Sequence, residues 1–190
     1  MTRTATHRLI DQLARVRELR EARAADSRLG AALSRLGAWQ AQRLAPTYAD
    51  LARMPRYAGA IEFFQSDLYG AADFSQRDTD LARIVPVLTR MLPDRVIGVV
   101  AQAMELNALS QELDRALVDA LGLRPTYSVA QYSRAFRRAG RVDARVRQIE
   151  LIVEVGRAID HYGRKAAIRN APTLMRAPAR AAGFGALQAF

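Results

Sequence analysis

Arginine is the residue type that offers this chain the most chemistry, and one group of arginines repeats at the spacing of a helix. Its members recur at three or four residues on both sides of Gly140, and they are Arg134, Arg137, Arg138, Arg141 and Arg145. Clustered guanidinium groups attract phosphate, in nucleic acid or anionic lipid, and also acidic proteins. We therefore predict an anion-binding surface here, called the arginine surface below. Only Tyr132 and Phe136 alternate with these arginines, so base stacking is not indicated.

The positive charge of the whole chain leaves a second interpretation open. The formal net charge is +10, and Lys165 is the only lysine. Abundant alanine and arginine with scarce lysine also follow from a GC-rich genome. The basic residues gather toward both ends of the chain, so part of the charge can neutralise a slightly acidic middle.

Carboxylates are the next candidates for chemistry. Glu105, Glu112 and Asp119 recur every seven residues, which would place them on one side of a helix. Arg115 shares that stripe, so an ion-paired, solvated face is favoured over a buried acidic ladder. A pocket near Tyr69, Asp73 and Glu105 stays open as a weaker hypothesis, in which the chain binds a small ligand or acts as an enzyme.

Metal, cofactor and nucleophile signatures are missing from the sequence. There is no cysteine, and the two histidines, His7 and His161, belong to no Glu-x-x-His motif. No nucleophile elbow, phosphate-binding glycine loop or dinucleotide fingerprint is present. We therefore predict no metal site, no cofactor and no catalytic residue, and favour a non-enzymatic protein.

The elements that position these residues are predicted to be helices throughout. Apolar residues recur at helical spacing, and no stretch alternates apolar and polar residues as a strand does. We expect an all-α fold, an irregular bundle of six to eight helices around a single core. Residues 1–190 form one domain in this interpretation: a long N-terminal helical region (1–45), a core bundle (46–164) and an irregular helical tail (165–190).

Capping residues predict where several helices begin and end. Residues 6–44 form either one helix or two that meet near residues 25–27, where Asp26 or Ser27 is the candidate cap. Pro46 ends this region, and Thr47 with Asp50 resembles a capping pair that opens a short helix through Met54.

Further helices are predicted from Pro93 to Leu121, from Ser128 to Ala139 with a Ser128–Gln131 capping pair, and over residues 141–164. The last of these has charged residues on one side and an apolar stripe on the other, consisting of Val142, Val146, Ile149, Val153 and Gly156. Another helix is expected over residues 56–69, with Tyr57, Ile61, Phe64 and Leu68 on one face.

No segment has the length and hydropathy of a signal core or a membrane span. Residues 1–19 are interrupted by charged side chains, and the longest quiet stretch, residues 96–104, is short and contains Gln102. The sequence therefore predicts a soluble cytoplasmic protein with no transmembrane segment.

Four short blocks resemble one known family. Phe63 and Phe64 are followed by Asp67, Leu68 and Tyr69, and then by residues 73–78; further blocks lie at residues 105–114, 147–157 and 178–188. Their order and content are similar to the bacterial FFLEELY-motif proteins. Gln65 and Ser66 depart from the motif for which the family is named. The resemblance implies a helical, cytoplasmic bacterial protein and no particular reaction. It also implies a further helical segment beyond Phe190, so we expect the chain to be truncated or completed by another helix.

These observations leave two main hypotheses for function. The first is a non-enzymatic protein–protein interaction module that associates with itself or with a partner helix. The alternative is a basic-surface binder of anionic partners, nucleic acid or anionic lipid, that uses the arginine surface.

Overall fold

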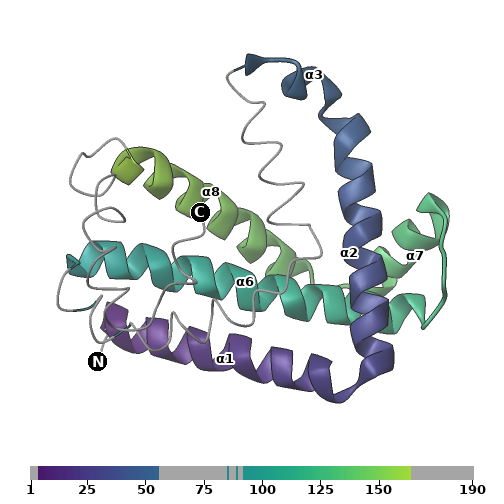
Figure 1. Ribbon diagram of the computed structural model, residues 1–190, viewed down its shortest axis with the longest axis horizontal. Helices are drawn as coiled ribbons and strands as arrows, with labels where there is room; N and C mark the ends of the chain where they lie inside the picture. Colours follow the sequence, from purple (N-terminus) through teal and green to yellow (C-terminus); the bar gives the residue numbers. More distant parts are fainter. Residues whose placement is uncertain (1–3, 56–84, 86–88, 90–91, 164–190) are drawn as a thin grey trace, which may run out of the picture. The chain divides into compact units, whose positions relative to one another are not determined.

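The structure is a computed structural model that describes residues 4–55, 85, 89 and 92–163 (Figure 1). The described residues form six helices and no strand, so the predicted all-α class of multi-helix bundle is confirmed. The helices are α1 (Ala5–Ala25), α2 (Ser27–Thr47), α3 (Ala49–Ala52), α6 (Asp94–Leu121), α7 (Val129–Ala139) and α8 (Val142–Gly163).

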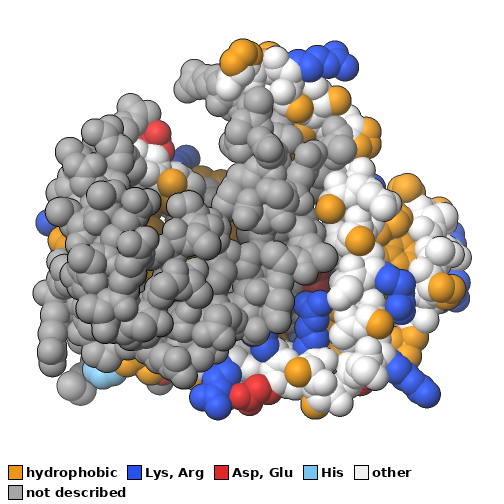
Figure 2. Space-filling view, viewed as in Figure 1, with side chains coloured by type: hydrophobic (Ala, Val, Ile, Leu, Met, Phe, Trp, Pro, Cys, Tyr) orange, Lys and Arg blue, Asp and Glu red, His pale blue; other side chains and the backbone are white. Residues whose placement is uncertain are grey.

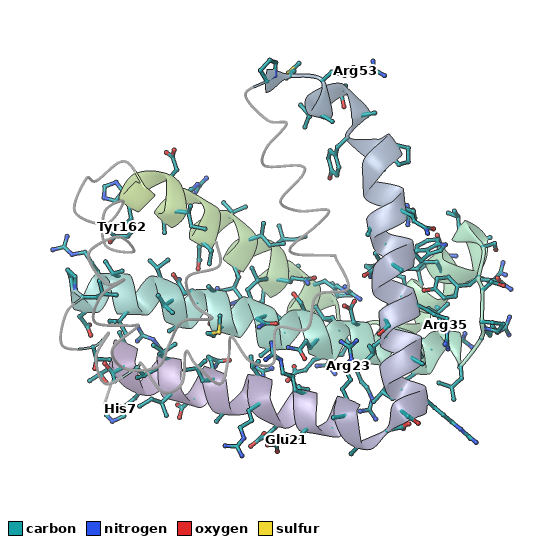
Figure 3. The ribbon with its side chains drawn as sticks, viewed as in Figure 1. His7, Glu21, Arg23, Arg35, Arg53 and Tyr162 are labelled. Carbon is teal, nitrogen blue, oxygen red and sulfur yellow. The ribbon has the colours of Figure 1, made fainter. Side chains whose placement is uncertain are left out.

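Two helices, α1 and α2, occupy the N-terminal region, which decides between the two alternatives left open by the sequence. Asp26 separates them, and its Oδ1 accepts hydrogen bonds from the backbone N–H groups of Arg28 and Leu29, both at 3.0 Å. Asp26 is therefore the N-cap of α2, because its carboxylate satisfies donors that the first helical turn leaves without partners. A further hydrogen bond joins α1 to α2 near this junction, in which Arg23 Nη2 donates to Ser34 Oγ at 2.8 Å (Figure 3).

The end of α2 differs from the prediction. Pro46 lies inside the last turn, and the helix continues to Thr47. The Thr47 hydroxyl donates to the Arg43 carbonyl at 2.7 Å, as threonine does within a helix. The predicted Thr47–Asp50 capping pair is therefore wrong. Tyr48 is the N-cap of α3, it makes no side-chain capping bond, and α3 ends at Ala52 rather than Met54.

The later boundaries agree with the sequence. Helix α6 ends at Leu121, and Gly122 follows with φ of 73°, a conformation that favours glycine. Helix α7 begins with the predicted capping box, in which the Gln131 N–H donates to Ser128 Oγ at 3.3 Å and the Ser128 N–H donates to Gln131 Oε1 at 2.8 Å.

Contacts divide the chain into two compact units. Unit 1 comprises residues 1–20, 74–111 and 141–190, and its described helical parts are the start of α1, most of α6, and α8. Within this unit α6 lies between α1 and α8 (Figure 1). One buried apolar cluster joins α1 and α6, and its members are Ala5, Leu9, Leu13, Val85, Ile97 and Ala101.

Unit 2 comprises residues 21–73 and 112–140. Its core joins α2, the end of α6 and α7 through Leu29, Ala32, Leu36, Leu117, Val118, Leu121 and Ala135. Burial of these aliphatic side chains is the main force that holds the three helices together. No helix in the described ranges is both long enough and apolar enough to cross a membrane.

Candidate functional site

The structure distributes the arginine surface over α7, the turn that follows it and α8. Arg134, Arg137 and Arg138 lie on α7 and are exposed. Arg138 Nη2 also donates to the Ala120 carbonyl at 2.6 Å, so this guanidinium satisfies an acceptor near the C-terminal end of α6. Arg134 and Arg137 are then the α7 members that are best placed to bind an anion.

The other two members of the arginine surface belong to unit 1. Arg141 is exposed and has φ of 61°, a left-handed conformation that interrupts helical spacing after Gly140. Its carbonyl accepts the backbone N–H of Arg145 at 2.9 Å in the first turn of α8. The five predicted arginines therefore do not share a single helix face.

An aromatic cluster with one arginine lies beside the α7 arginines in unit 2. Trp39 of α2 stacks on Tyr132 of α7 with ring centroids 4.5 Å apart, and the Tyr127 ring is 5.2 Å from Trp39. The Arg43 guanidinium lies over both stacked rings, 4.9 Å from the Trp39 centroid and 5.5 Å from the Tyr132 centroid. A cation at these distances is attracted by the faces of the rings.

Hydrogen bonds fix the stacked pair. Gln40 Nε2 donates to Asp114 Oδ1 at 3.3 Å and to the Tyr132 hydroxyl at 3.4 Å, which connects α2 to both α6 and α7. The Tyr127 hydroxyl is buried and has no hydrogen-bond partner in the structure. Burial raises the pKa of Tyr127, and the neighbouring Tyr132 adds to the increase, so this hydroxyl stays neutral.

Two open pockets lie on unit 2. The first, of about 300 Å³, is lined by Arg43, Tyr132, Ser133, Phe136 and Arg137. It therefore combines two guanidinium groups, a serine side chain and two aromatic rings. In Figure 2, arginine side chains are interspersed with hydrophobic ones over α2 and α7.

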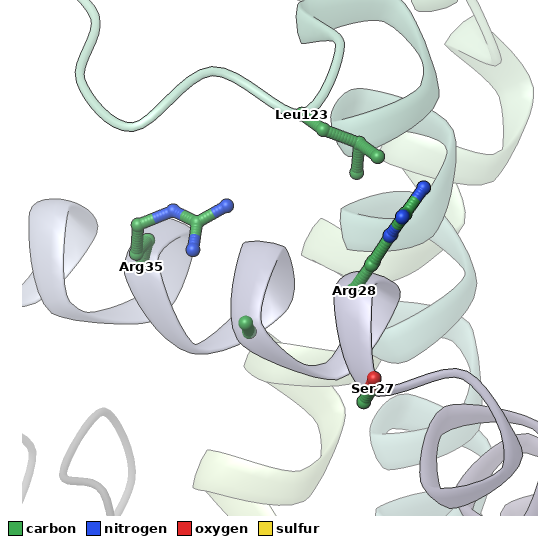
Figure 4. Close-up of a pocket in the computed structure, with 5 residues that line it drawn as sticks. Ser27, Arg28, Arg35 and Leu123 are labelled. Carbon is green, nitrogen blue, oxygen red and sulfur yellow. The ribbon is translucent and has the colours of Figure 1, made fainter.

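The second pocket, of about 440 Å³, is lined by Ser27, Arg28, Ala31, Arg35 and Leu123 (Figure 4). The Nε of Arg35 is buried and has no hydrogen-bond partner in the structure. Both pockets are thus basic, and neither has, among its described lining residues, a carboxylate that could act as a general acid or base.

Helix α8 exposes an apolar face to solvent. Six aliphatic side chains on it keep between 41% and 71% of their surface accessible, and they are Val142, Val146, Ile149, Ile152, Val153 and Ile159. The helix contacts the rest of unit 1 through its opposite side, where Leu151 and Val155 are buried. We call the exposed side the outer face of α8.

Polar side chains connect α8 to α6 beside the buried leucine. Arg147 forms a two-point ion pair with Glu105, with Nε–Oε1 at 3.0 Å and Nη2–Oε2 at 3.4 Å. This hydrogen bond raises the pKa of Arg147, and its burial acts in the opposite direction. Gln148 Nε2 donates to Ser110 Oγ at 2.8 Å, and Gln102 Nε2 donates to Glu154 Oε2 at the same distance.

Ion pairs involve Glu105 and Asp119 of the acidic stripe of α6, but the half-buried Glu105 pairs with another helix, whereas the favoured interpretation expects a solvated face. Glu105 binds Arg147, and Asp119 lies 3.8 Å from Arg115 one turn earlier on the same helix. Glu112 is half-buried. Glu105 would have to break its pair with Arg147 to act in the pocket predicted near Tyr69 and Asp73, two residues that lie outside the described ranges.

The histidines lie near helix ends. His7 is in the first turn of α1, with Nδ1 2.7 Å from Thr4 Oγ1, and His161 meets Tyr162 edge to face near the end of α8 (Figure 3). Among the described residues, no group of three histidine or acidic side chains could hold a metal ion.

The motif residues Phe63, Phe64, Asp67, Leu68 and Tyr69 lie outside the described residues.

Part of the unit 2 site does not follow from the sequence analysis. Trp39 and Arg43 were not predicted to meet Tyr132, although each side contains an i,i+4 signal: Trp39 with Arg43 on α2, and Tyr132 with Phe136 on α7.

Comparison with known proteins places the chain in a family. A family described as a domain of unknown function, DUF8198, matches residues 19–190. Neither the curated proteins nor the solved structures include a significant match to the chain. Because the match covers most of the sequence, this chain belongs to the DUF8198 family.

Proposed function

We propose that this chain is a non-enzymatic helical module that binds a protein partner through the outer face of α8. The observation that supports this best is the exposure of six aliphatic side chains along one helix. A single exposed aliphatic residue is ordinary, but a contiguous row on one helix is typical of a surface that another helix covers.

The polar residues of unit 1 support binding rather than catalysis. Glu105 is paired with Arg147, and Arg147 also lies 3.5 Å from Glu150 and 3.7 Å from Glu154. These groups hold α8 on α6 and leave the outer face aliphatic. Because these contacts fix α8 on α6, the outer face is ordered before a partner binds, and this lowers the entropic cost of binding.

We expect Ile149→Asp to abolish partner binding, because it places a charge in the middle of the outer face. The measurement is affinity capture from extract of the source cells with the full chain, quantified by mass spectrometry. Val129→Asp is the matched control, since Val129 is also exposed but lies on α7. Proteins captured by the wild type and the control should be lost with Ile149→Asp. Equal capture by all three chains would contradict the proposal.

The pocket beside Arg43 and Arg137 favours a second candidate function, the binding of anionic partners. Two guanidiniums next to aromatic rings suit a phosphate group attached to an apolar or aromatic moiety. Arg134 lies three residues before Arg137 on α7 and extends the basic area along this helix.

The double variant Arg134→Glu with Arg137→Glu should elute from heparin at clearly lower salt than the wild type, since each lost phosphate contact reduces the salt dependence of binding. The control is Arg53→Glu with Arg95→Glu, which changes the net charge equally at exposed positions that do not belong to α7. An equal decrease for both variants would mean that net charge alone causes retention, and the α7 surface would then be excluded.

The four sequence blocks support a finer assignment, which stays a prediction. We infer from them a bacterial FFLEELY-motif protein that acts in the cytoplasm. The family match at residues 19–190 spans all four blocks, and is compatible with this inference.

A further inference from the structure

We propose that the partner on the outer face of α8 is a second copy of this chain, paired antiparallel through α8. The inference rests on the proposed function, and it adds the identity and the orientation of the partner.

The outer face has the spacing of a coiled-coil seam. Its central residues follow one another at intervals of four, three, four and three, in the order Val142, Val146, Ile149, Val153 and Gly156. This alternation keeps one stripe facing a second helix over several turns. The stripe is therefore suited to another long helix rather than to a loop or a strand.

Gly156 indicates how the second helix is placed. It lies inside α8, where glycine is unfavourable compared with alanine, and a Cβ atom built there would meet no neighbouring atom of the described residues within 4 Å. An antiparallel helix that sets Ile149 against the partner's Val153 also sets Val146 against the partner's Gly156. The larger side chain then fills the space that glycine leaves open.

Flanking charges favour the same arrangement. Asp143, Glu150 and Arg157 recur every seven residues along one edge of the stripe. In an antiparallel pair, this edge of one helix faces the same edge of the other, so Asp143 lies opposite the partner's Arg157. The two-fold symmetry of the dimer produces this attraction twice. Glu150 lies near the partner's Glu150, but it is already 3.5 Å from Arg147 in its own chain.

A parallel pair fits the stripe less well. It would set Gly156 against the partner's Gly156, which leaves a gap in the seam. It would also set Asp160, the next position of the stripe, against the partner's Asp160, and two carboxylates at that distance repel each other. The antiparallel arrangement avoids both defects.

The first test uses charge reversal in the full chain, followed by sedimentation equilibrium. The wild type should approach twice its 21.0 kDa mass as concentration rises. Asp143→Arg alone and Arg157→Asp alone should each weaken self-association about tenfold, because like charges then meet twice. An equimolar mixture of the two variants should restore it, since residues 143 and 157 that face each other in the mixed dimer are again of opposite sign.

The second test measures orientation. The chain has no cysteine, so single cysteines can be placed freely. Ile152 lies beside the symmetry axis of the antiparallel pair, and Ile152→Cys should be joined to the partner's cysteine by a short bismaleimide. Val142→Cys is the control, because its two copies would be about 27 Å apart along the helix. Cross-linking of Val142→Cys with none of Ile152→Cys would overturn the antiparallel arrangement.

These outcomes separate the inference from the proposed function. A wild type that is monomeric at every concentration, or a mixture that fails to restore association, overturns the dimer. The protein-binding function would still stand in that case if Ile149→Asp loses the proteins captured from extract. If captured proteins do not depend on Ile149 but the charge-reversal mixture restores a dimer, the outer face serves self-association alone.

Discussion

Leu151→Ala should lower the free energy of unfolding by about 3 kcal/mol, whereas Ile149→Ala should change it by less than about 0.5 kcal/mol. The two residues lie two positions apart on α8, and their side chains differ in exposure from 0% for Leu151 to 62% for Ile149. Truncation of Leu151 leaves a cavity in the protein interior, but truncation of Ile149 removes contacts mainly with water.

Urea denaturation followed by circular dichroism measures both changes. The protein should be dilute enough to be monomeric, because self-association through Ile149 would add to the stability of the wild type. A larger loss for Ile149→Ala than for Leu151→Ala in the monomer would show that α8 buries its other side. Every proposal about the outer face would then fail.

Gly140→Ala should destabilise the protein by about 2 kcal/mol. Gly140 has φ of 62° and ψ of −122°, a region that residues with a Cβ atom rarely adopt. Beyond its chain neighbours, no atom of the described residues lies within 4 Å of the position that a Cβ would take, so the cost comes from the backbone and not from a clash. The midpoint of thermal unfolding should fall accordingly.

The neighbouring residue provides the control for this prediction. Arg141 also has a positive φ, of 61°, but it has a side chain and pays the cost of that conformation already. Arg141→Gly should raise the free energy of unfolding by about 0.5 kcal/mol, because relief of this strain exceeds the added entropy of the unfolded chain. A stable Gly140→Ala protein would contradict the turn geometry between α7 and α8.

Local signals predicted most of the helix boundaries. Gly122, Gly140 and the Ser128–Gln131 capping box mark their positions through backbone preferences that hold in any surroundings. The role of Thr47 does not follow from the sequence, because a threonine hydroxyl can either cap the next helix or bond the preceding turn, and local sequence does not distinguish the two.

The buried side of α8 could not be predicted in the same way. Apolar periodicity normally identifies the buried face of a helix, but α8 has aliphatic residues on two sides. The choice between them is made by contacts with α6, and these involve charged and amide side chains whose partners are distant in sequence.

The candidate site was predictable in composition rather than in geometry. Clustered arginines near residues 134–145 are visible in the sequence, but the bond from Arg138 to the Ala120 carbonyl depends on how α7 packs in unit 2. The same holds for the contact of Arg43 with Tyr132, which joins residues far apart in the chain.

The polar contacts between α6 and α8 also restrict how that joint can move. Three contacts are spread along the length of α6: Gln102 binds Glu154, Glu105 binds Arg147, and Ser110 binds Gln148. A slide of α8 by one helical turn, about 5.4 Å, would separate all three couples at once. Small axial displacements of α8 along α6 are therefore disfavoured, and α8 should either keep its axial position or detach from α6 as a whole.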